Sequence, residues 1–221
     1  MNKIHNKNID YADLYFQYSK NEFWSLEDGQ VKNGSYSIDQ GVGIRSVSEE
    51  KTAFTYSDDI SLSVLNDSLK IISSIEKQGQ SVSMPAPKKP SREKIYTNND
   101  PLVGLDSQKK IDLLEKIESI AKLIDKRVIK VSASLAIQYE VVLIQNYYGQ
   151  LIEDVRPLIR LSISVISELD GKREQGSAGG GGRYLLDYFT DEILENYAKK
   201  AVKQSLVNLD ARPAPAGSMT V

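Results

Sequence analysis

Apolar and polar residues alternate along residues 12–57, as they do in strands that bury one face of a sheet. The clearest run begins at Leu14 and Phe16, which alternate with polar neighbours. Turn-forming sequences interrupt the alternation at Glu27-Asp28-Gly29, at Asn33-Gly34 and at Glu49-Glu50-Lys51. The pattern therefore predicts antiparallel strands joined by hairpins.

The hydrophobic period then changes to that of a helix. Apolar residues recur at helical spacing from Ile60 to Ile75, with Asp58 or Asp59 as the expected N-cap and Gly79 as the expected stop. Four prolines within residues 79–104 predict a linker without regular structure. A further helix is expected from a cap at Asp106 or Ser107 to about Lys126.

The second half repeats this plan. Alternation over residues 131–143 and 161–165 predicts strands, with turns at Tyr148-Gly149 and Asp170-Gly171. A glycine-rich loop is expected next, and then a helix from about Asp191 to Asn208 with Thr190 as its cap.

The fold class that follows is α+β: two antiparallel-sheet-plus-helix units joined by a proline-rich linker and an extra helix. We expect a first domain over residues 1–80, the linker over 81–106 and a second domain over 107–210. The sequence of residues 211–221 predicts a linker and the first residues of a new strand. We therefore expect that the chain is the front portion of a longer protein with a further C-terminal domain.

Composition limits the catalytic sites and the partners that the chain could have. The chain of 221 residues has no cysteine and one histidine, His5, so neither a Ser-His-Asp triad nor a His/Cys zinc site can be assembled from it. A net charge of −2 gives no electrostatic argument for nucleic acid. No run of about 18 apolar residues and no secretory signal is present, which predicts a cytoplasmic protein without a membrane partner.

The run SAGGGGR is the sharpest candidate for a binding site. Gly179, Gly180, Gly181 and Gly182 allow a ligand or another backbone to approach closely, and Arg173 and Arg183 flank the run and could hold a carboxylate or phosphate. A flexible connection between strand and helix explains the same sequence. The run lacks the lysine of a P-loop, which makes an independent nucleotide-binding protein the weakest hypothesis.

Two other segments have structural explanations. GVGIRS, residues 41–46, lacks the third glycine of a dinucleotide fingerprint and predicts a strand with small residues against which another element packs. Arg156 and Arg160 bracket Pro157 at an expected strand entrance, where they could bind an acidic partner or be solvated.

Several strings taken together resemble the N-terminal part of the TldD branch of the TldD/PmbA family of metalloproteases. They are DYADLYFQ, LEDGQVKNGSYSIDQGVGIRSVSEEKTAF, DVRPLIRLSISV, DGKREQGSAGGGGRY and NLDARPAPAGSM, and they span nearly the whole chain. The resemblance implies a protease subunit that pairs with a PmbA-type (TldE) paralogue and cleaves unfolded or small peptides.

The resemblance also implies zinc in the full-length family, held by a His-Glu-x-x-x-His motif and a distant cysteine, with the glutamate as general base. Neither the motif nor a cysteine occurs in this chain, so no catalytic or metal-binding residue carries over. We therefore expect a portion of a TldD-like protease that is inactive alone, and whether the chain is itself an enzyme stays open. The alternative is a non-catalytic peptide-binding or dimerisation module that self-associates or accepts an added strand.

Overall fold

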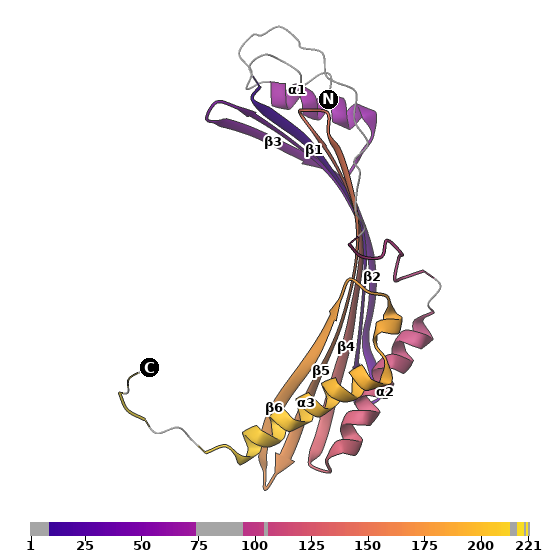
Figure 1. Cartoon of the computed structure of the whole chain (residues 1–221), viewed down its shortest axis with the longest axis vertical. Helices are drawn as coiled ribbons and strands as arrows, with labels where there is room; N and C mark the ends of the chain where they lie inside the picture. The colour runs from indigo at the N-terminus through magenta and orange to yellow at the C-terminus, as the bar shows by residue number, and fades with distance from the viewer. Residues whose placement is uncertain (1–8, 74–94, 104–105, 213–215, 219, 221) are drawn as a thin grey trace. The chain divides into compact units, whose positions relative to one another are not determined.

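The computed structural model describes residues 9–73, 95–103, 106–212, 216–218 and 220, and these contain six strands, three α-helices and a short 3₁₀ helix (Figure 1). In chain order they are β1 (Tyr11–Glu27), β2 (Gln30–Ser48), β3 (Lys51–Ser57), α1 (Leu62–Ser73), α2 (Ser107–Ile124), β4 (Val128–Asn146), β5 (Leu151–Leu169), β6 (Lys172–Gly182), η1 (Leu186–Tyr188) and α3 (Asp191–Asp210). The strands form one antiparallel sheet in the order β3-β2-β1-β4-β5-β6. The predicted α+β class is confirmed.

The chain divides into two compact units. Unit 1 comprises the described residues of 1–21, 36–100 and 138–157, and unit 2 those of 22–35, 101–137 and 158–221. Strands β1, β2, β4 and β5 each begin in one unit and end in the other. The units are therefore not consecutive in sequence, and the boundaries expected at residues 80 and 107 stay a prediction.

Most of the predicted turns are confirmed by backbone geometry. Asp28 and Gly29 have φ values of 48° and 73°, as the two central residues of a tight hairpin require. Positive φ values also occur at Glu49, Gly149 and the Asp170-Gly171 pair, where the other hairpins turn. The adjacent pairs β1–β2, β2–β3, β4–β5 and β5–β6 are thus joined by short connections, whereas β1 and β4 pair across a long separation in the chain.

The turn predicted at Asn33-Gly34 is wrong, because β2 passes through it as continuous strand. A Cβ atom on Gly34 would lie 2.7 Å from Cζ3 of Trp24, so the indole of the neighbouring strand covers this glycine. An aromatic ring that packs over a strand glycine shields the exposed backbone there. The glycine therefore marks close packing within the sheet instead of a reversal of the chain.

Pro157 is likewise not at a strand entrance. It lies inside β5, which begins at Leu151. The fixed φ of proline is compatible with extended backbone wherever its missing N–H is not needed by the ladder. The alternation of buried with more exposed residues begins at Pro157 and runs to Val165.

Unit 1 has a small core between its strands and α1. The buried residues are Ile9, Ala12, Leu14, Val42, Ile44 and Ile72. Helix α1 begins at Leu62, after a turn in which the carboxylate of Asp59 accepts the N–H of Ser61 at 2.8 Å. The predicted stop at Gly79 and most of the proline-rich linker lie outside the described residues, as does most of the strand start expected at residues 219–221.

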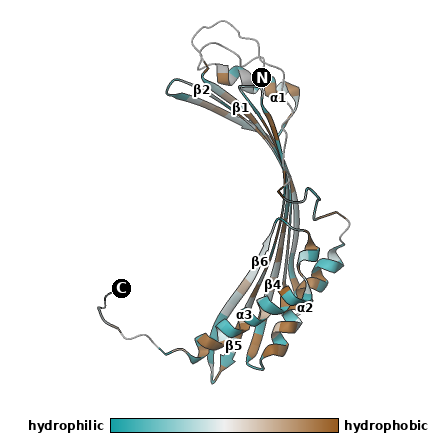
Figure 2. Cartoon of the chain, viewed as in Figure 1, coloured by the Kyte–Doolittle hydropathy of each residue, from teal (hydrophilic) through white to brown (hydrophobic). Residues whose placement is uncertain are grey.

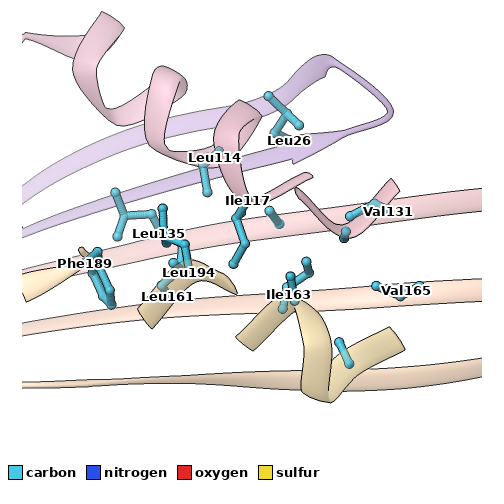
Figure 3. Packing of buried hydrophobic residues seen from close by; sticks show 14 of the residues in the cluster. Leu26, Leu114, Ile117, Val131, Leu135, Leu161, Ile163, Val165, Phe189 and Leu194 are labelled. Atoms are coloured by element: carbon cyan, nitrogen blue, oxygen red, sulfur yellow. The ribbon is translucent and has the colours of Figure 1, made fainter. Parts of the chain in front are cut away.

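Unit 2 has the larger core, formed where α2 and α3 cover one face of the strands (Figure 1). Figure 3 shows Leu114 and Ile117 of α2 among side chains of the strands, with Leu194 of α3 beside them. In Figure 2 the outward sides of both helices are mainly hydrophilic. Burial of these apolar side chains stabilises the unit by roughly 1.5–3 kcal/mol for each large residue.

The two helix starts of unit 2 fall where the sequence places them. Asp106 is the N-cap of α2, and its carboxylate accepts the N–H of Lys109 at 2.9 Å, which satisfies one otherwise unpaired donor. Thr190 occupies the N-cap position of α3 without a side-chain hydrogen bond. Asp191 and Glu192 then lie in the first turn, where negative charge favours the helix dipole.

Candidate functional site

The glycine run lies in a strand, so the loop predicted there is wrong. Strand β6 pairs antiparallel with β5 from Leu169↔Lys172 to Ile159↔Gly182, and it is the last strand in the sheet order. Glycine has no side chain to display an alternating pattern, so hydrophobic periodicity could not reveal this strand. Its backbone hydrogen bonds to β5 define it instead.

Internal close approach accounts for the glycines. A Cβ atom at Gly179 would lie 2.4 Å from the Leu161 carbonyl oxygen, and one at Gly180 would lie 2.2 Å from Oη of Tyr197 on α3. At Gly181, where φ is +156°, it would lie 1.9 Å from the Ile159 carbonyl oxygen. Gly179 and Gly181 have no room for a side chain because the backbone of β5 occupies that space, whereas a side chain at Gly180 would require the Tyr197 side chain to move.

The outer edge of β6 is capped by α3 only in part. Gln204 accepts the Ser177 N–H at 2.9 Å, and Asn208 donates to the Gln175 carbonyl at 2.9 Å. Backbone groups two residues apart face the same edge of a strand, so those of Gly179 also point away from β5. Within the described ranges no hydrogen bond reaches these groups of Gly179, which leaves a short stretch of open sheet edge.

The structure does not bring the two flanking arginines together. Arg173 stands near the start of β6 and pairs with Glu168, its cross-strand neighbour, at 2.5 Å. Arg183 follows the other end of the strand, about ten residues and therefore roughly 30 Å further on. The two guanidinium groups cannot hold one anion between them.

A hollow that the sequence did not single out lies on the open face of unit 2. Along β5, Leu161, Ile163 and Val165 are buried under the helices, so the alternating Ser162 and Ser164 lie on the opposite face. That face carries a hollow of about 530 Å³. Six serines from four strands line it: Ser25, Ser132, Ser134, Ser162, Ser164 and Ser177.

The charged residues at this serine hollow set its electrostatics. Arg160 and Lys32 line it together with Glu27, whose carboxylate lies 3.0 Å from Nζ of Lys130. The hydrogen bond from Lys130 is the main cause that lowers the pKa of Glu27. Hydroxyl groups both donate and accept hydrogen bonds, so the hollow can satisfy a polar backbone without requiring one charge. The repeated serines at alternating positions were the sequence signal for this surface.

These groups form a polar hollow without an evident reaction centre. The only histidine, His5, lies outside the described residues, and the chain has no cysteine. Among the described residues no group of three or more His, Cys, Asp or Glu side chains could hold a metal ion. No chemical step is therefore assigned to the zinc that the family resemblance implies.

The other sequence candidates have structural roles. Arg156 is partly exposed, and its guanidinium is already paired with two carboxylates of its own chain, Asp154 at 2.8 Å and Glu140 at 3.2 Å. The hydrogen bond to Asp154 is the main cause that raises the pKa of Arg156 above its usual value. The strand expected at GVGIRS is confirmed as part of β2, where the Phe54 ring lies 3.3 Å from a Cβ built on Gly43.

The region described by the structure contains no helix that is both long and apolar enough to cross a membrane.

Comparison with known proteins places the chain in a family. Residues 12–77 match the PmbA/TldA metallopeptidase domain 1, and residues 100–209 match the PmbA/TldA metallopeptidase central domain. A protein of Haemophilus influenzae named metalloprotease TldD homolog is 49% identical over 222 residues, which cover 97% of this chain and 46% of that protein. The chain thus spans about half the length of the curated relatives that it matches.

Two solved structures share the fold at low sequence identity. A protein from Thermotoga maritima, described as a modulator of DNA gyrase, matches with a TM-score of 0.73 and 18% identity over 94% of this chain and 46% of that chain. TldE from Thermococcus kodakarensis matches with a TM-score of 0.66 and 15% identity over 90% of this chain and 45% of that chain. Sequence and fold agree, and the chain belongs to the PmbA/TldD metallopeptidase family.

Proposed function

We propose that the chain is the peptide-binding scaffold of a TldD-like zinc metalloprotease subunit, which processes unfolded peptides and is inactive alone. The observation that carries the proposal is the identity of 49% with a metalloprotease TldD homolog across nearly the whole chain. The metal ligands would come from protein outside this chain, since its described residues offer no ligand cluster.

The serine hollow and the open edge at Gly179 support recognition through the peptide backbone. An extended peptide can add to a sheet edge by main-chain hydrogen bonds, while nearby pockets receive alternate side chains. The hollow reaches Ser177 and Gly179 themselves, so hydroxyl groups adjoin the open backbone. Such recognition depends little on sequence, which suits a protease that acts on unfolded chains.

The proposed assembly is cytoplasmic, with a PmbA/TldE-like paralogue as partner or with self-association in its place. Neither nucleic acid nor a membrane is expected to participate. This choice of partner follows from the family to which the chain belongs.

A chimera tests the proposal. Replacing the aligned residues of the Haemophilus influenzae homologue with this chain should give a protein that cleaves an unfolded peptide in the presence of zinc and loses activity with a chelator. The chain alone should neither cleave the peptide nor bind zinc stoichiometrically. A well-folded chimera without activity, or cleavage by the chain alone, would contradict the proposal, and the intact relative is the positive control.

The second candidate is a non-catalytic peptide-binding or dimerisation module. It is favoured by the open edge of β6, which needs no metal to accept a strand. Anisotropy of a labelled unfolded peptide and sedimentation of the chain distinguish the two candidates. Peptide binding by a monodisperse chain, together with a folded but inactive chimera, would favour this alternative.

A further inference from the structure

Two aromatic rings stand exposed on the edge strand β3. The side chains of Phe54 and Tyr56 are 62% and 80% exposed, and their ring centroids lie 6.2 Å apart at an interplanar angle of 28°. Ala53, between the strand's exposed positions, packs instead against the core of unit 1. The two rings therefore lie on the face of the sheet that the core does not use.

A hollow of about 720 Å³ lies against these rings, within unit 1. Tyr15 adds a third aromatic side chain to its lining, and Asp39 and Asp58 add two carboxylates. Among the residues that the structure describes, no lysine or arginine belongs to the lining. Asp39 accepts only a long hydrogen bond from Ser37, at 3.3 Å, and Asp58 has no ion-pair or hydrogen-bond partner in the described part of the chain.

Unit 1 already contains cations held by an aromatic ring and a carboxylate together. The guanidinium carbon of Arg45 lies 5.5 Å from the Tyr11 ring centroid, and its Nη2 lies 2.5 Å from Asp13. The hydrogen bond from Arg45 to Asp13 is the main cause that raises the pKa of Arg45. Arg45 is the cross-strand neighbour of Phe54, so this arrangement of ring, carboxylate and cation lies next to a residue that lines the hollow.

Lys20 repeats the arrangement elsewhere in the unit. Its Nζ lies 5.7 Å from the Tyr139 ring centroid and 2.8 Å from Asp100. The hollow at Phe54 and Tyr56 has the same two kinds of partner, ring and carboxylate, but no cation among its described lining residues. Cations are attracted to an aromatic face by its quadrupole and to carboxylates by charge.

We propose that this aromatic–carboxylate hollow binds lysine or arginine side chains of an unfolded peptide. The nature of the occupant rests on the proposed function, whereas the preference for a cation rests on the charge of the hollow. Phe54 and Tyr56 stack against the cationic group, and Asp39 and Asp58 neutralise it. The hollow thus gives peptide binding a preference for basic segments that backbone recognition in unit 2 lacks.

Fluorescence anisotropy with a pair of matched peptides tests the proposal on the chain as it exists. One labelled Gly/Ser peptide carries three arginines, and its partner carries the uncharged isostere citrulline at the same positions. The arginine peptide should bind about tenfold more tightly. Equal affinity for the two peptides, or absence of binding by both, would overturn the proposal.

Substitutions in the hollow test whether the preference for the arginine peptide arises there. The double variant Asp39→Asn/Asp58→Asn, and separately Tyr56→Ser, should weaken binding of the arginine peptide by about five- to tenfold and leave the citrulline peptide unaffected. The matched control Glu192→Gln/Glu195→Gln removes the same charge from the exposed surface of α3 and should change affinity by less than about twofold. An equal loss of affinity in the control variant would show that the preference comes from the net charge of the chain, and this would refute the proposal.

This result is independent of cleavage. An active chimera with no arginine preference would refute the hollow as a cation site and leave the proposed function intact. A preference for arginine in a chain whose chimera is folded but inactive would support the hollow as a cation site and refute the proposed function.

Discussion

Lys110 is a charged side chain buried at the start of an otherwise apolar helix surface. It is 4% exposed, and its Nζ lies 2.7 Å from both carboxylate oxygens of Glu22, which is 9% exposed. Trp24 donates its indole N–H to the same carboxylate. Each charge is thus fully compensated, and removal of one partner would leave the other buried and unpaired.

The variant Lys110→Met should destabilise unit 2 by about 3 kcal/mol, because Glu22 would keep only the indole N–H as a close donor. Urea unfolding followed by the fluorescence of Trp24, the single tryptophan, measures the change directly. The double variant Glu22→Gln/Lys110→Met should recover much of the loss. Lys116→Met, which removes the exposed pair with Asp191, is the matched control and should change stability by less than about 1 kcal/mol. A loss in Lys110→Met no larger than in the control would refute the role of the buried pair.

At the scale of secondary-structure elements, the contact of α3 with β6 depends on small residues of the strand, Gly176, Ala178 and Gly180, which face the helix. A Cβ atom at Gly176 would lie 2.1 Å from the Ala201 carbonyl oxygen and 2.4 Å from the Ser205 backbone nitrogen. Ser205 in turn bonds Ser167 of β5 at 2.7 Å through buried hydroxyl groups. Helix and sheet therefore approach more closely here than any alanine would permit.

Replacement of Gly176 by alanine should force α3 away from the sheet and destabilise unit 2 by about 2–3 kcal/mol, as overpacking does. A thermal melt should show a fall in Tm of at least about 4 °C. Gly217→Ala, where a Cβ meets nothing within 4 Å, controls for the change of residue type and should leave Tm unchanged. Equal melting of the two variants would show that the helix has room to move.

Helix α2 ends at an acidic residue whose charge is held in place. Two donors of Arg127, its guanidinium first and its backbone N–H second, lower the pKa of Asp125 to about 2. The unfolded value is about 3.9, so the pairing contributes its full stability above about pH 4 and loses it as the pH falls toward 2. Both groups are partly exposed, and solvent screening limits the contribution to about 1 kcal/mol.

Asp125→Asn should therefore flatten the loss of stability between pH 4 and pH 2.5 by about 1 kcal/mol, measured by urea unfolding at the two pH values. Asp187→Asn removes an exposed carboxylate elsewhere in unit 2 and serves as control. A pH dependence identical to that of the unsubstituted chain would show that Arg127 does not hold the charged form of Asp125.

At the scale of the whole molecule, the balance of charge bears on whether the chain binds nucleic acid. A fold relative is described as a modulator of DNA gyrase, but this chain carries 28 basic and 30 acidic residues and a net charge of −2. Affinity for duplex DNA comes mainly from basic residues that neutralise phosphates. Resemblance in fold does not transfer that kind of function.

We therefore expect no retention of labelled duplex DNA by the chain in a filter-binding assay at 0.15 M salt. Weak retention that vanishes between low and moderate salt would reflect non-specific charge contacts only. Sequence-dependent binding at micromolar concentrations would contradict the expectation. A basic DNA-binding protein on the same filter provides the positive control.

The sequence predicted turns and helix caps correctly where they depend on the side chains of neighbouring residues. The turns at Asp28-Gly29 and Asp170-Gly171 and the cap at Asp106 were correct because they depend on neighbours in the chain. The errors at Gly34 and at Gly179–Gly182 have one cause. In a single sequence glycine favours the prediction of a turn or loop, yet Gly34, Gly179, Gly180 and Gly181 each lie against an atom of another element, such as the Trp24 ring at Gly34.

The sequence by itself determined the α+β class, the helices, most hairpins and, through its specific strings, the family. These follow from local backbone preferences and from side-chain periodicity, which neighbouring residues carry. Only the tertiary structure decided that the strands form one sheet, that Arg173 and Arg183 lie far apart, and that serines and aromatic–carboxylate groups gather in hollows. Cross-strand register makes those groups neighbours, and register is a property of pairing between distant segments.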